Sequence, residues 1–177
     1  VQQLALSTAQ GFIEVENQGN EEISLSLMLS RTPSANEDVK PIFNGVEIDV
    51  QYADLKGNAI TIDKLQQGEE FLAKIRVKKT NDSSPSMALT YAIPSGWEIW
   101  NERLTGGEES QGATYTDIRD TSISWYFAIE HGQTKEFVVR LRAAYGGQFV
   151  LPPTICEDMY NPSCRANTTN GLTIVVR

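Results

Sequence analysis

The chain has 177 residues, 40% of them hydrophobic and 21% charged, which is enough to bury one core and is ordinary for a globular domain. Its 15 basic and 23 acidic residues give a net charge of −8, so we do not expect it to bind nucleic acid or an anionic membrane surface. No apolar run approaches the roughly 20 residues that span a bilayer, and no basic-then-apolar leader opens the chain.

The N-terminal segment alternates like a β-hairpin. Hydrophobic residues occupy every second position from Ile23 to Leu29, and residues 7–20 and 21–31 are predicted as two strands around a turn at 17–20. The polar stretch 32–38 contains a proline and breaks this pattern. We therefore predict that residues 1–36 are the closing strands of a preceding β domain and that residues 37–177 form a second domain.

The rest of the chain repeats short alternating segments between turn residues, a pattern typical of a β-sandwich. Residues 155–160 could form one or two helical turns, which Asn161 and Pro162 would end. The predicted class is all-β, an antiparallel β-sandwich with at most one short helix near 155–160. The expected strands are 46–52, 60–62, 71–78, 87–93, 115–119, 122–129, 135–144, 148–151 and 172–177.

The two cysteines, Cys156 and Cys164, lie eight positions apart, and the chain has one histidine, His131. A zinc site needs about four ligands at short spacings, which this set does not supply, so we expect no metal. We predict a local disulfide between Cys156 and Cys164, which implies an oxidising compartment. The alternative is a pair of reduced, half-buried cysteines that behave as small hydrophobic residues.

The chain carries no recognisable catalytic motif. It has no GxSxG elbow, no phosphate-binding P-loop and no HExxH segment, and His131 lies in a polar stretch typical of a hairpin tip. Asp117, Asp120 and Glu130 could pair like the carboxylates of a glycosidase, but solvated charges at strand ends are the simpler interpretation. We therefore expect that the chain is not an enzyme and that it has no cofactor.

Three tryptophans, Trp97, Trp100 and Trp125, suggest a different class of function, because aromatic faces stack on sugar rings. The simpler interpretation is that the rings fill the core and its rim. An adhesion or carbohydrate-binding sandwich of a cell-surface protein is thus the alternative function. Burial of all three tryptophans would count against it.

The later part of the chain carries a series of motifs in a fixed order. The motifs are Ile93-Pro-Ser-Gly-Trp-Glu-Ile-Trp-Asn101, Tyr115-Thr-Asp-Ile-Arg-Asp120, Trp125-Tyr-Phe127, Phe137-Val-Val-Arg-Leu-Arg-Ala-Ala-Tyr145-Gly, Leu151-Pro-Pro153 and Cys156-Glu-Asp-Met-Tyr-Asn-Pro162. In this order, the series resembles the C-terminal domain of bacterial alpha-2-macroglobulins, over roughly residues 46–177. Ile93 replaces the usual leucine of the family and Asn161 the usual aspartate.

The resemblance implies a macroglobulin-like, receptor-binding-type sandwich at 37–177, after the end of a macroglobulin-like or CUB-like domain at 1–36. It implies a non-catalytic part of a protease inhibitor, in which cleavage of a bait region exposes a Cys-x-Glu-Gln thioester of a separate helical domain. This chain lacks that motif, because no glutamine follows Cys156-Glu-Asp. In the family, the loop that matches Met159 and Tyr160 shields the thioester from water and amines. The alternative is that both side chains pack on their own sheet.

The resemblance also implies partners and a location. The expected partners are the thioester and the neighbouring macroglobulin domains of the same parent chain, and target proteases only indirectly. Because Val1 is not an initiator methionine, we expect a processed or excised piece. The expected location is the periplasm or the bacterial cell surface, with any lipid anchor on the parent's N-terminus and no direct membrane contact from this part.

Overall fold

The computed structural model describes residues 14–22, 24, 38–100 and 112–177. The chain divides into two units, Val1–Ala35 and Asn36–Arg177. In the first unit, Asn17 forms a turn: its Oδ1 accepts a hydrogen bond from the Gly19 N–H at 2.9 Å, and its Nδ2 donates one to the Glu21 carbonyl at 2.7 Å. The strands expected at 7–20 and 21–31 fall largely outside the described residues, and the domain boundary at residue 36 stays a prediction.

The described part of the second unit consists of β-strands joined by turns, with no helix. Alternation of buried and exposed side chains runs through the long strands, as the sequence predicts. The strands are β1 (Ile42–Asn44), β2 (Val46–Ala53), β3 (Lys64–Gln66), β4 (Glu70–Lys79), β5 (Ser86–Ala92), β6 (Trp97–Ile99), β7 (Tyr115–Arg119), β8 (Ser122–Ala128), β9 (Thr134–Ala143), β10 (Gly147–Leu151), β11 (Ile155–Asp158), β12 (Arg165–Asn167) and β13 (Gly171–Val176).

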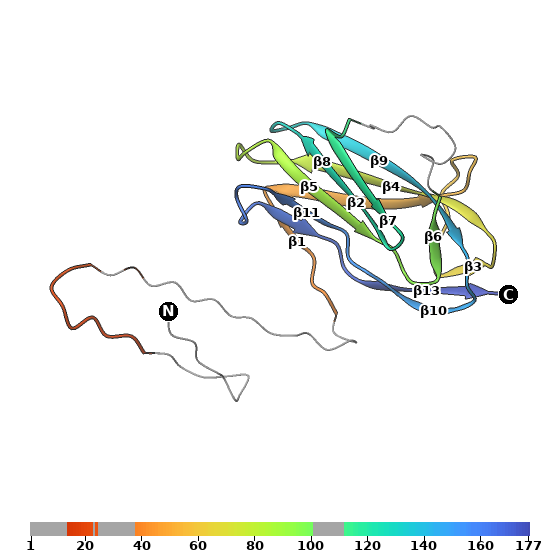
Figure 1. The fold of residues 1–177 in the computed structure, drawn as a ribbon, viewed down its shortest axis with the longest axis horizontal. Helices are drawn as coiled ribbons and strands as arrows, with labels where there is room; N and C mark the ends of the chain where they lie inside the picture. Colours follow the sequence, from red (N-terminus) through yellow and green to blue (C-terminus); the bar gives the residue numbers. More distant parts are fainter. Residues whose placement is uncertain (1–13, 23, 25–37, 101–111) are drawn as a thin grey trace. The chain divides into compact units, whose positions relative to one another are not determined.

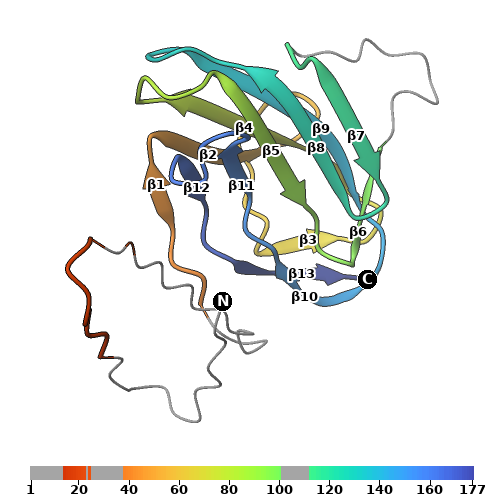
Figure 2. The ribbon, with the colours of Figure 1, turned by 60° about the vertical axis from the view of Figure 1, so that its left-hand side comes forward.

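Three sheets build this unit, as Figures 1 and 2 show. One layer of the sandwich has six strands in the order β1-β12-β11-β5-β8-β7, and the other has four in the order β2-β4-β9-β6. A small sheet, β10-β13-β3, lies at the end near β6 and the C-terminus (Figure 1). Every strand pair is antiparallel except β13 with β3. The all-β sandwich predicted from the sequence is therefore confirmed.

Aromatic side chains join the two layers. Phe137 of β9 packs against Trp125 and Phe127 of β8, with ring centroids 5.0 and 4.9 Å apart. The hydroxyl oxygens of Tyr52 and Tyr91 lie 3.4 Å apart across the layers, and burial raises the pKa of both phenols. Aromatic rings that pack edge-on or tilted fill a sandwich core. Such pairs stabilise the fold by more than the burial of their surface alone would.

Two local predictions are wrong. Residues 155–160, expected as a short helix, form β11 and a turn, because Cys156 and Asp158 point into the core while Ile155 and Glu157 point out. In addition, β11 pairs with β5 on one side and β12 on the other, so a strand conformation satisfies the hydrogen-bonding groups of its backbone. The strand expected at 60–62 is also absent; only an isolated bridge joins Ala53 to Ala59, and the strand lies at 64–66.

No helix within the described ranges is long and apolar enough to cross a membrane.

Candidate functional site

The β11–β12 turn, residues 159–164, carries the two residues for which the family resemblance implies a shielding role. Met159 is 50% exposed and Tyr160 is 77% exposed, so neither ring nor thioether is buried on its own sheet. Hydrogen bonds hold the turn on both sides: the Asp158 N–H donates to the Cys164 carbonyl at 2.9 Å and the Met159 N–H donates to the Ser86 carbonyl of β5 at 3.0 Å. Two exposed side chains thus project from a turn with a defined backbone.

Asp158 lies directly under this turn with a fully buried side chain. Its Oδ1 accepts hydrogen bonds from the backbone N–H groups of Tyr160 and Asn161, at 2.9 and 3.0 Å. Its Oδ2 accepts one from the Ser83 hydroxyl at 2.9 Å. Burial by itself would raise the pKa of Asp158, but these hydrogen bonds and the Lys79 ammonium outweigh it and hold the pKa below its usual range. The carboxylate is therefore charged at neutral pH.

Lys79 is the cation that faces this carboxylate. Its Nζ lies 3.7 Å from Asp158 Oδ2, and the lysine side chain is also fully buried. The ammonium donates hydrogen bonds to the Ser83 hydroxyl at 2.8 Å and to the Ser84 carbonyl at 2.9 Å. It also contacts two sulfur atoms, Met87 Sδ at 3.4 Å and Cys164 Sγ at 3.5 Å. We refer to Lys79, Ser83 and Asp158 as the Lys79 network.

Sequence reasoning missed this network, although one signal for it is present in the sequence. Lys79 is in phase with the buried residues of β4, because Phe71, Ala73, Ile75 and Val77 occupy the preceding odd positions. Period-2 alternation therefore places Lys79 on the inner face and its neighbour on the outer one. A charged residue at a core position of a strand indicates a buried partner.

The structure corrects the predicted disulfide: Cys156 and Cys164 are both free and both buried. The register explains why they are not bonded. Ala166 lies opposite Cys156 across the ladder, while Cys164 lies opposite Asp158, so the cysteines are diagonal neighbours on one face. A disulfide requires Cβ atoms about 4 Å apart, and diagonal positions are roughly 7–8 Å apart.

The thiol of Cys156 is held in its neutral form. Burial raises the pKa of Cys156 to about 12, and the neighbouring Cys164 adds to this, while Lys79 acts in the opposite direction. Since the thiolate is the reactive form of cysteine, this side chain is a packing residue, which is the alternative that the sequence left open. Cysteine chemistry therefore gives no support to an oxidising compartment.

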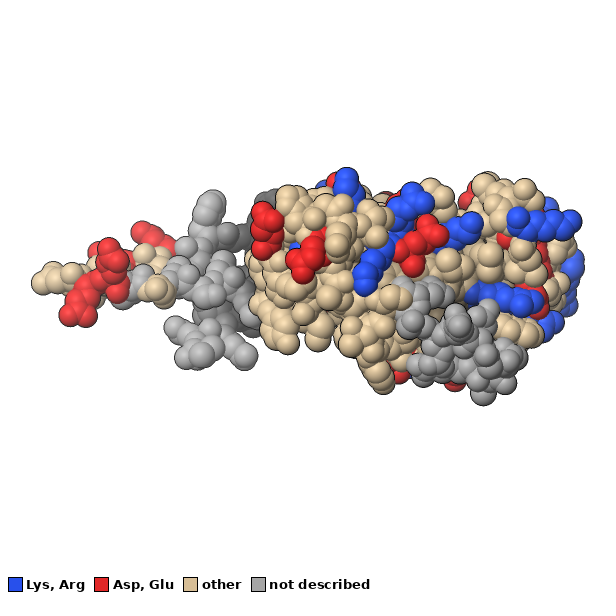
Figure 3. All heavy atoms as spheres, turned by 90° about the horizontal axis from the view of Figure 1, so that it is seen from above, with Lys and Arg blue, Asp and Glu red and all other residues tan. Residues whose placement is uncertain are grey.

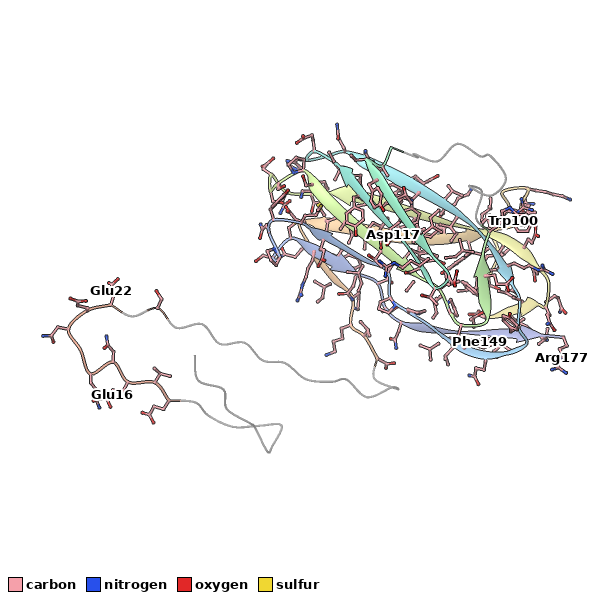
Figure 4. All side chains as sticks on the ribbon, in the orientation of Figure 1. Glu16, Glu22, Trp100, Asp117, Phe149 and Arg177 are labelled. Atoms are coloured by element: carbon pink, nitrogen blue, oxygen red, sulfur yellow. The ribbon has the colours of Figure 1, made fainter. Side chains whose placement is uncertain are left out.

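The tryptophans do not form a platform for a sugar. Trp97 and Trp125 are buried in the core, and Trp100 is 38% exposed. The Arg140 guanidinium lies over the Trp100 ring, 4.7 Å from its centroid, and Arg140 pairs with Glu70 at 2.5 Å. Figure 4 shows Trp100 at the periphery of the sandwich, on the side away from the β11–β12 turn. Two of the three tryptophans are therefore buried, and the third is partly exposed with a cation over its ring.

The candidate catalytic carboxylates do not converge. Asp117 pairs with Arg119 at 2.8 Å on β7, where Figure 4 labels it. Asp120 and Glu130 follow β7 and β8, which run antiparallel, and so lie at opposite ends of β8. His131 Nδ1 lies 2.9 Å from Asp82 at an exposed turn. In the part of the chain that the structure covers, no three His, Cys, Asp or Glu side chains are grouped as metal ligands would be.

The outer face of the four-stranded sheet carries charges of both signs. Arg76 pairs with Glu136 at 3.2 Å and Lys78 with Glu47 at 3.9 Å, all four side chains being exposed to solvent. A hollow of about 380 Å³ on this face lies among such residues, and its Asp49 already accepts a hydrogen bond from Gln51 at 2.8 Å. Figure 3, a view from above, shows basic and acidic side chains interspersed rather than separated. Among the described residues in this view, no extended region of one sign is seen that would select a polyanion.

Comparison with known proteins finds a matching family model and several relatives. The family model described as the bacterial alpha-2-macroglobulin MG10 domain matches residues 45–163. Alpha-2-macroglobulin of Escherichia coli K12 is 25% identical over 93% of this chain and 11% of its own length, and that of Pasteurella multocida Pm70 is 26% identical over 80% and 7%. The chain thus spans about a tenth of the length of these curated relatives.

Solved structures agree with this assignment. The cryo-EM structure of native E. coli alpha-2-macroglobulin superposes with a TM-score of 0.72, at 26% identity over 80% of this chain and 10% of that one. The crystal structure of a Salmonella alpha-2-macroglobulin mutant, Y1175G, gives a TM-score of 0.71 at 26% identity, with the same coverage. With a family model matched over two thirds of its residues, this chain belongs to the bacterial alpha-2-macroglobulin family, and its second unit contains the MG10 domain.

Proposed function

We propose that this chain is a non-catalytic part of an alpha-2-macroglobulin-type protease inhibitor, and that its β11–β12 turn shields a reactive thioester of the parent protein. Met159 and Tyr160 are the shielding side chains. Together they offer a flexible apolar group and a ring with one polar end, which suit a lid over a group that must be kept from water and amines.

The observation that carries the proposal is the exposure of both side chains on an ordered turn. Tyr160 is 77% exposed and Met159 50% exposed, yet the backbone beneath them is hydrogen-bonded to β5 and to Asp158. Exposed apolar side chains on a constrained backbone are typical of a contact surface. These exposures favour the lid over the rival interpretation, in which the two residues pack on their own sheet.

The relatives supply a second line of support. The Salmonella protein has been solved after reaction with methylamine and the E. coli protein after activation by trypsin, according to the descriptions of those structures. Reaction with a small amine is the behaviour of an acyl thioester, which such a nucleophile opens. By extension, the parent of this chain would inhibit proteases that cleave it, in the periplasm or at the cell surface, with neighbouring macroglobulin domains as partners.

Intact-mass analysis of the full-length parent, with and without methylamine, tests the proposal. We expect the addition of one methylamine, and a rate of addition that rises when Tyr160 is replaced by alanine. Tyr145→Ala is the matched control, because Tyr145 is also more than half exposed but follows β9, in another part of the domain. Equal rates for the two variants would mean that Tyr160 shields nothing.

A further inference from the structure

A buried ion pair lies at the base of an exposed turn, and it joins the two layers of the sandwich. Lys79 ends β4 of the four-stranded sheet, while Asp158 ends β11 of the six-stranded sheet. Their charged groups are 3.7 Å apart and both side chains are fully buried. At this end of the domain, the position of the β11–β12 turn is therefore tied to the opposite layer.

The Asp158 carboxylate determines the local conformation of the turn. One of its oxygens accepts hydrogen bonds from two successive backbone N–H groups, those of Tyr160 and Asn161. An aspartate that binds the amides two and three positions ahead holds the chain in a tight turn. The direction in which Tyr160 leaves the domain thus depends on where this carboxylate is held.

The carboxylate is in turn held by donors from outside its own hairpin. Ser83, in the β4–β5 connection, donates to Asp158 Oδ2 at 2.9 Å. Lys79 anchors Ser83 at 2.8 Å and the Ser84 carbonyl at 2.9 Å, so the connection and the carboxylate share one cation. Its other contacts are the sulfur atoms of Met87 and Cys164, which offer no competing anion.

Stability alone does not account for such a pair. Apolar side chains of similar volume stabilise a core as well as a buried ion pair, or better, because the charges must be desolvated. An ion pair also fixes the position of the carboxylate. The carboxylate keeps its hydrogen bonds to the turn only while it is charged and held in place.

We propose that Lys79, Ser83 and Asp158 are positioning residues, which hold the β11–β12 turn so that Met159 and Tyr160 project in one fixed orientation. The network itself is a property of this domain; its consequence for a thioester rests on the function proposed above. Where the shield operates, loosening the network is expected to open it without any change to Met159 or Tyr160.

Amide hydrogen exchange on the 177-residue chain, followed by NMR, tests the network directly. In Asp158→Ala, the amides of Tyr160 and Asn161 are expected to exchange on the order of tenfold faster, because each loses a charge-assisted hydrogen bond. The amide of Phe137 in β9 should be affected less. Asp158→Asn keeps one acceptor oxygen and should restore part of the protection.

General destabilisation would look different, since it would accelerate exchange at Phe137 and at Tyr160 by the same factor. That result, or unchanged exchange at Tyr160 and Asn161, overturns the proposal. Should Asp158→Ala fail to fold, the double variant Lys79→Met, Asp158→Ala removes both charges and the acceptor oxygens together and leaves no uncompensated ion in the core. The same local acceleration is expected from it.

Methylamine addition to the full-length parent carrying Asp158→Ala, the variant used for the exchange measurement, separates the two proposals. Faster exchange at the turn together with faster methylamine addition supports both. Faster exchange with an unchanged rate of methylamine addition supports positioning and refutes shielding by this turn. Unchanged exchange refutes positioning, whatever the rate of methylamine addition.

Discussion

Lys78 and Lys79 are neighbours at the end of β4, but their ammonium groups lie in opposite environments. Lys78 is about half exposed and faces Glu47 across the strand at 3.9 Å, while Lys79 is fully buried and faces Asp158. The outer pair belongs to a row of solvated charges on the sheet, and the inner pair supports the β11–β12 turn. Two identical side chains one position apart thus have different roles, because a strand alternates its faces.

The difference between the two pairs is one of solvation. Water competes with an exposed pair and salt screens it, so it contributes little to the free energy of unfolding. A buried pair has lost its hydration, so removing one partner leaves an unpaired charge in the core. Loss of a partner should therefore lower the free energy of unfolding more for the buried pair than for the exposed pairs. The following experiments measure this difference.

The largest effect is expected for Lys79→Met. This change leaves the Asp158 carboxylate buried without its cation and should lower the free energy of unfolding by about 3–5 kcal/mol. Lys78→Met, one residue away on the exposed face, should lower it by less than about 1 kcal/mol. Urea denaturation of the two variants gives both values. Equal losses would show that burial does not separate the two lysines.

Gly45→Ala is expected to have the next largest effect, because it disturbs the surroundings of the buried pair from the other side. Gly45 has φ of +75°, and a Cβ there would lie 2.2 Å from Asn81 Nδ2 and 3.0 Å from Cys164 Sγ. Left-handed backbone strain and displacement of Asn81 together should cost about 2 kcal/mol or more.

Gly57→Ala is the control for that variant. Gly57 also has a positive φ, +90°, but nothing lies within 4 Å of its Cβ position. It should show the backbone strain alone, about 1–2 kcal/mol. Thermal denaturation of both variants compares them, and a larger loss for Gly57→Ala would mean that the close approach at Gly45 is relieved without cost.

Alkaline pH tests the burial of the Cys156 thiol. Burial and the nearby Cys164 raise the pKa of Cys156 from 9.0 to about 12. A raised pKa in the folded state contributes stability that is complete below pH 9 and is lost as the pH rises from 9 towards 12. At pH 10 the loss should be on the order of 1 kcal/mol. Cys156→Ala should remove this part of the pH dependence, as measured by urea denaturation at pH 8 and pH 10. If the free energy of unfolding falls by the same amount between these pH values in the variant, the prediction is wrong.

The smallest effect is expected on the exposed face. Glu136→Gln removes the partner of Arg76, a pair with both side chains about half exposed, and should change the free energy of unfolding by about 0.2–1 kcal/mol. The change should shrink as sodium chloride is raised from about 0.1 M to 1 M, because screening shortens from about 10 Å to 3 Å. An effect as large as that of Lys79→Met, or one that salt leaves unchanged, would contradict the comparison.

Much of the fold could be predicted from local patterns. The alternation in β4, β8 and β9 follows directly from Phe71 to Val77, Ser122 to Ala128 and Lys135 to Ala143, since one face of each strand is apolar. The turn with Met159 and Tyr160 was singled out through resemblance to the family. The short strands β1, β3, β6 and β12 were not found, because three residues carry no readable period and depend on a neighbouring strand for pairing.

Two of the errors share one cause. The helix expected at 155–160 and the disulfide expected between Cys156 and Cys164 were both inferred from spacing along the chain. Pairing of β11 with β5 and β12 decides both, since it extends the first segment and places the two cysteines diagonally. Register is a property of two strands together, and neither strand encodes it alone.

The sequence by itself determined the all-β class, the inward and outward faces of the long strands and the family of the chain, because period-2 alternation and ordered motifs are local. Only the tertiary structure decided that Lys79 meets Asp158, which lies 79 residues further along the chain, and that their charges support an exposed turn. The physical reason is that a buried charge is tolerated only beside its partner, and partners from different sheets come together only when the sandwich closes.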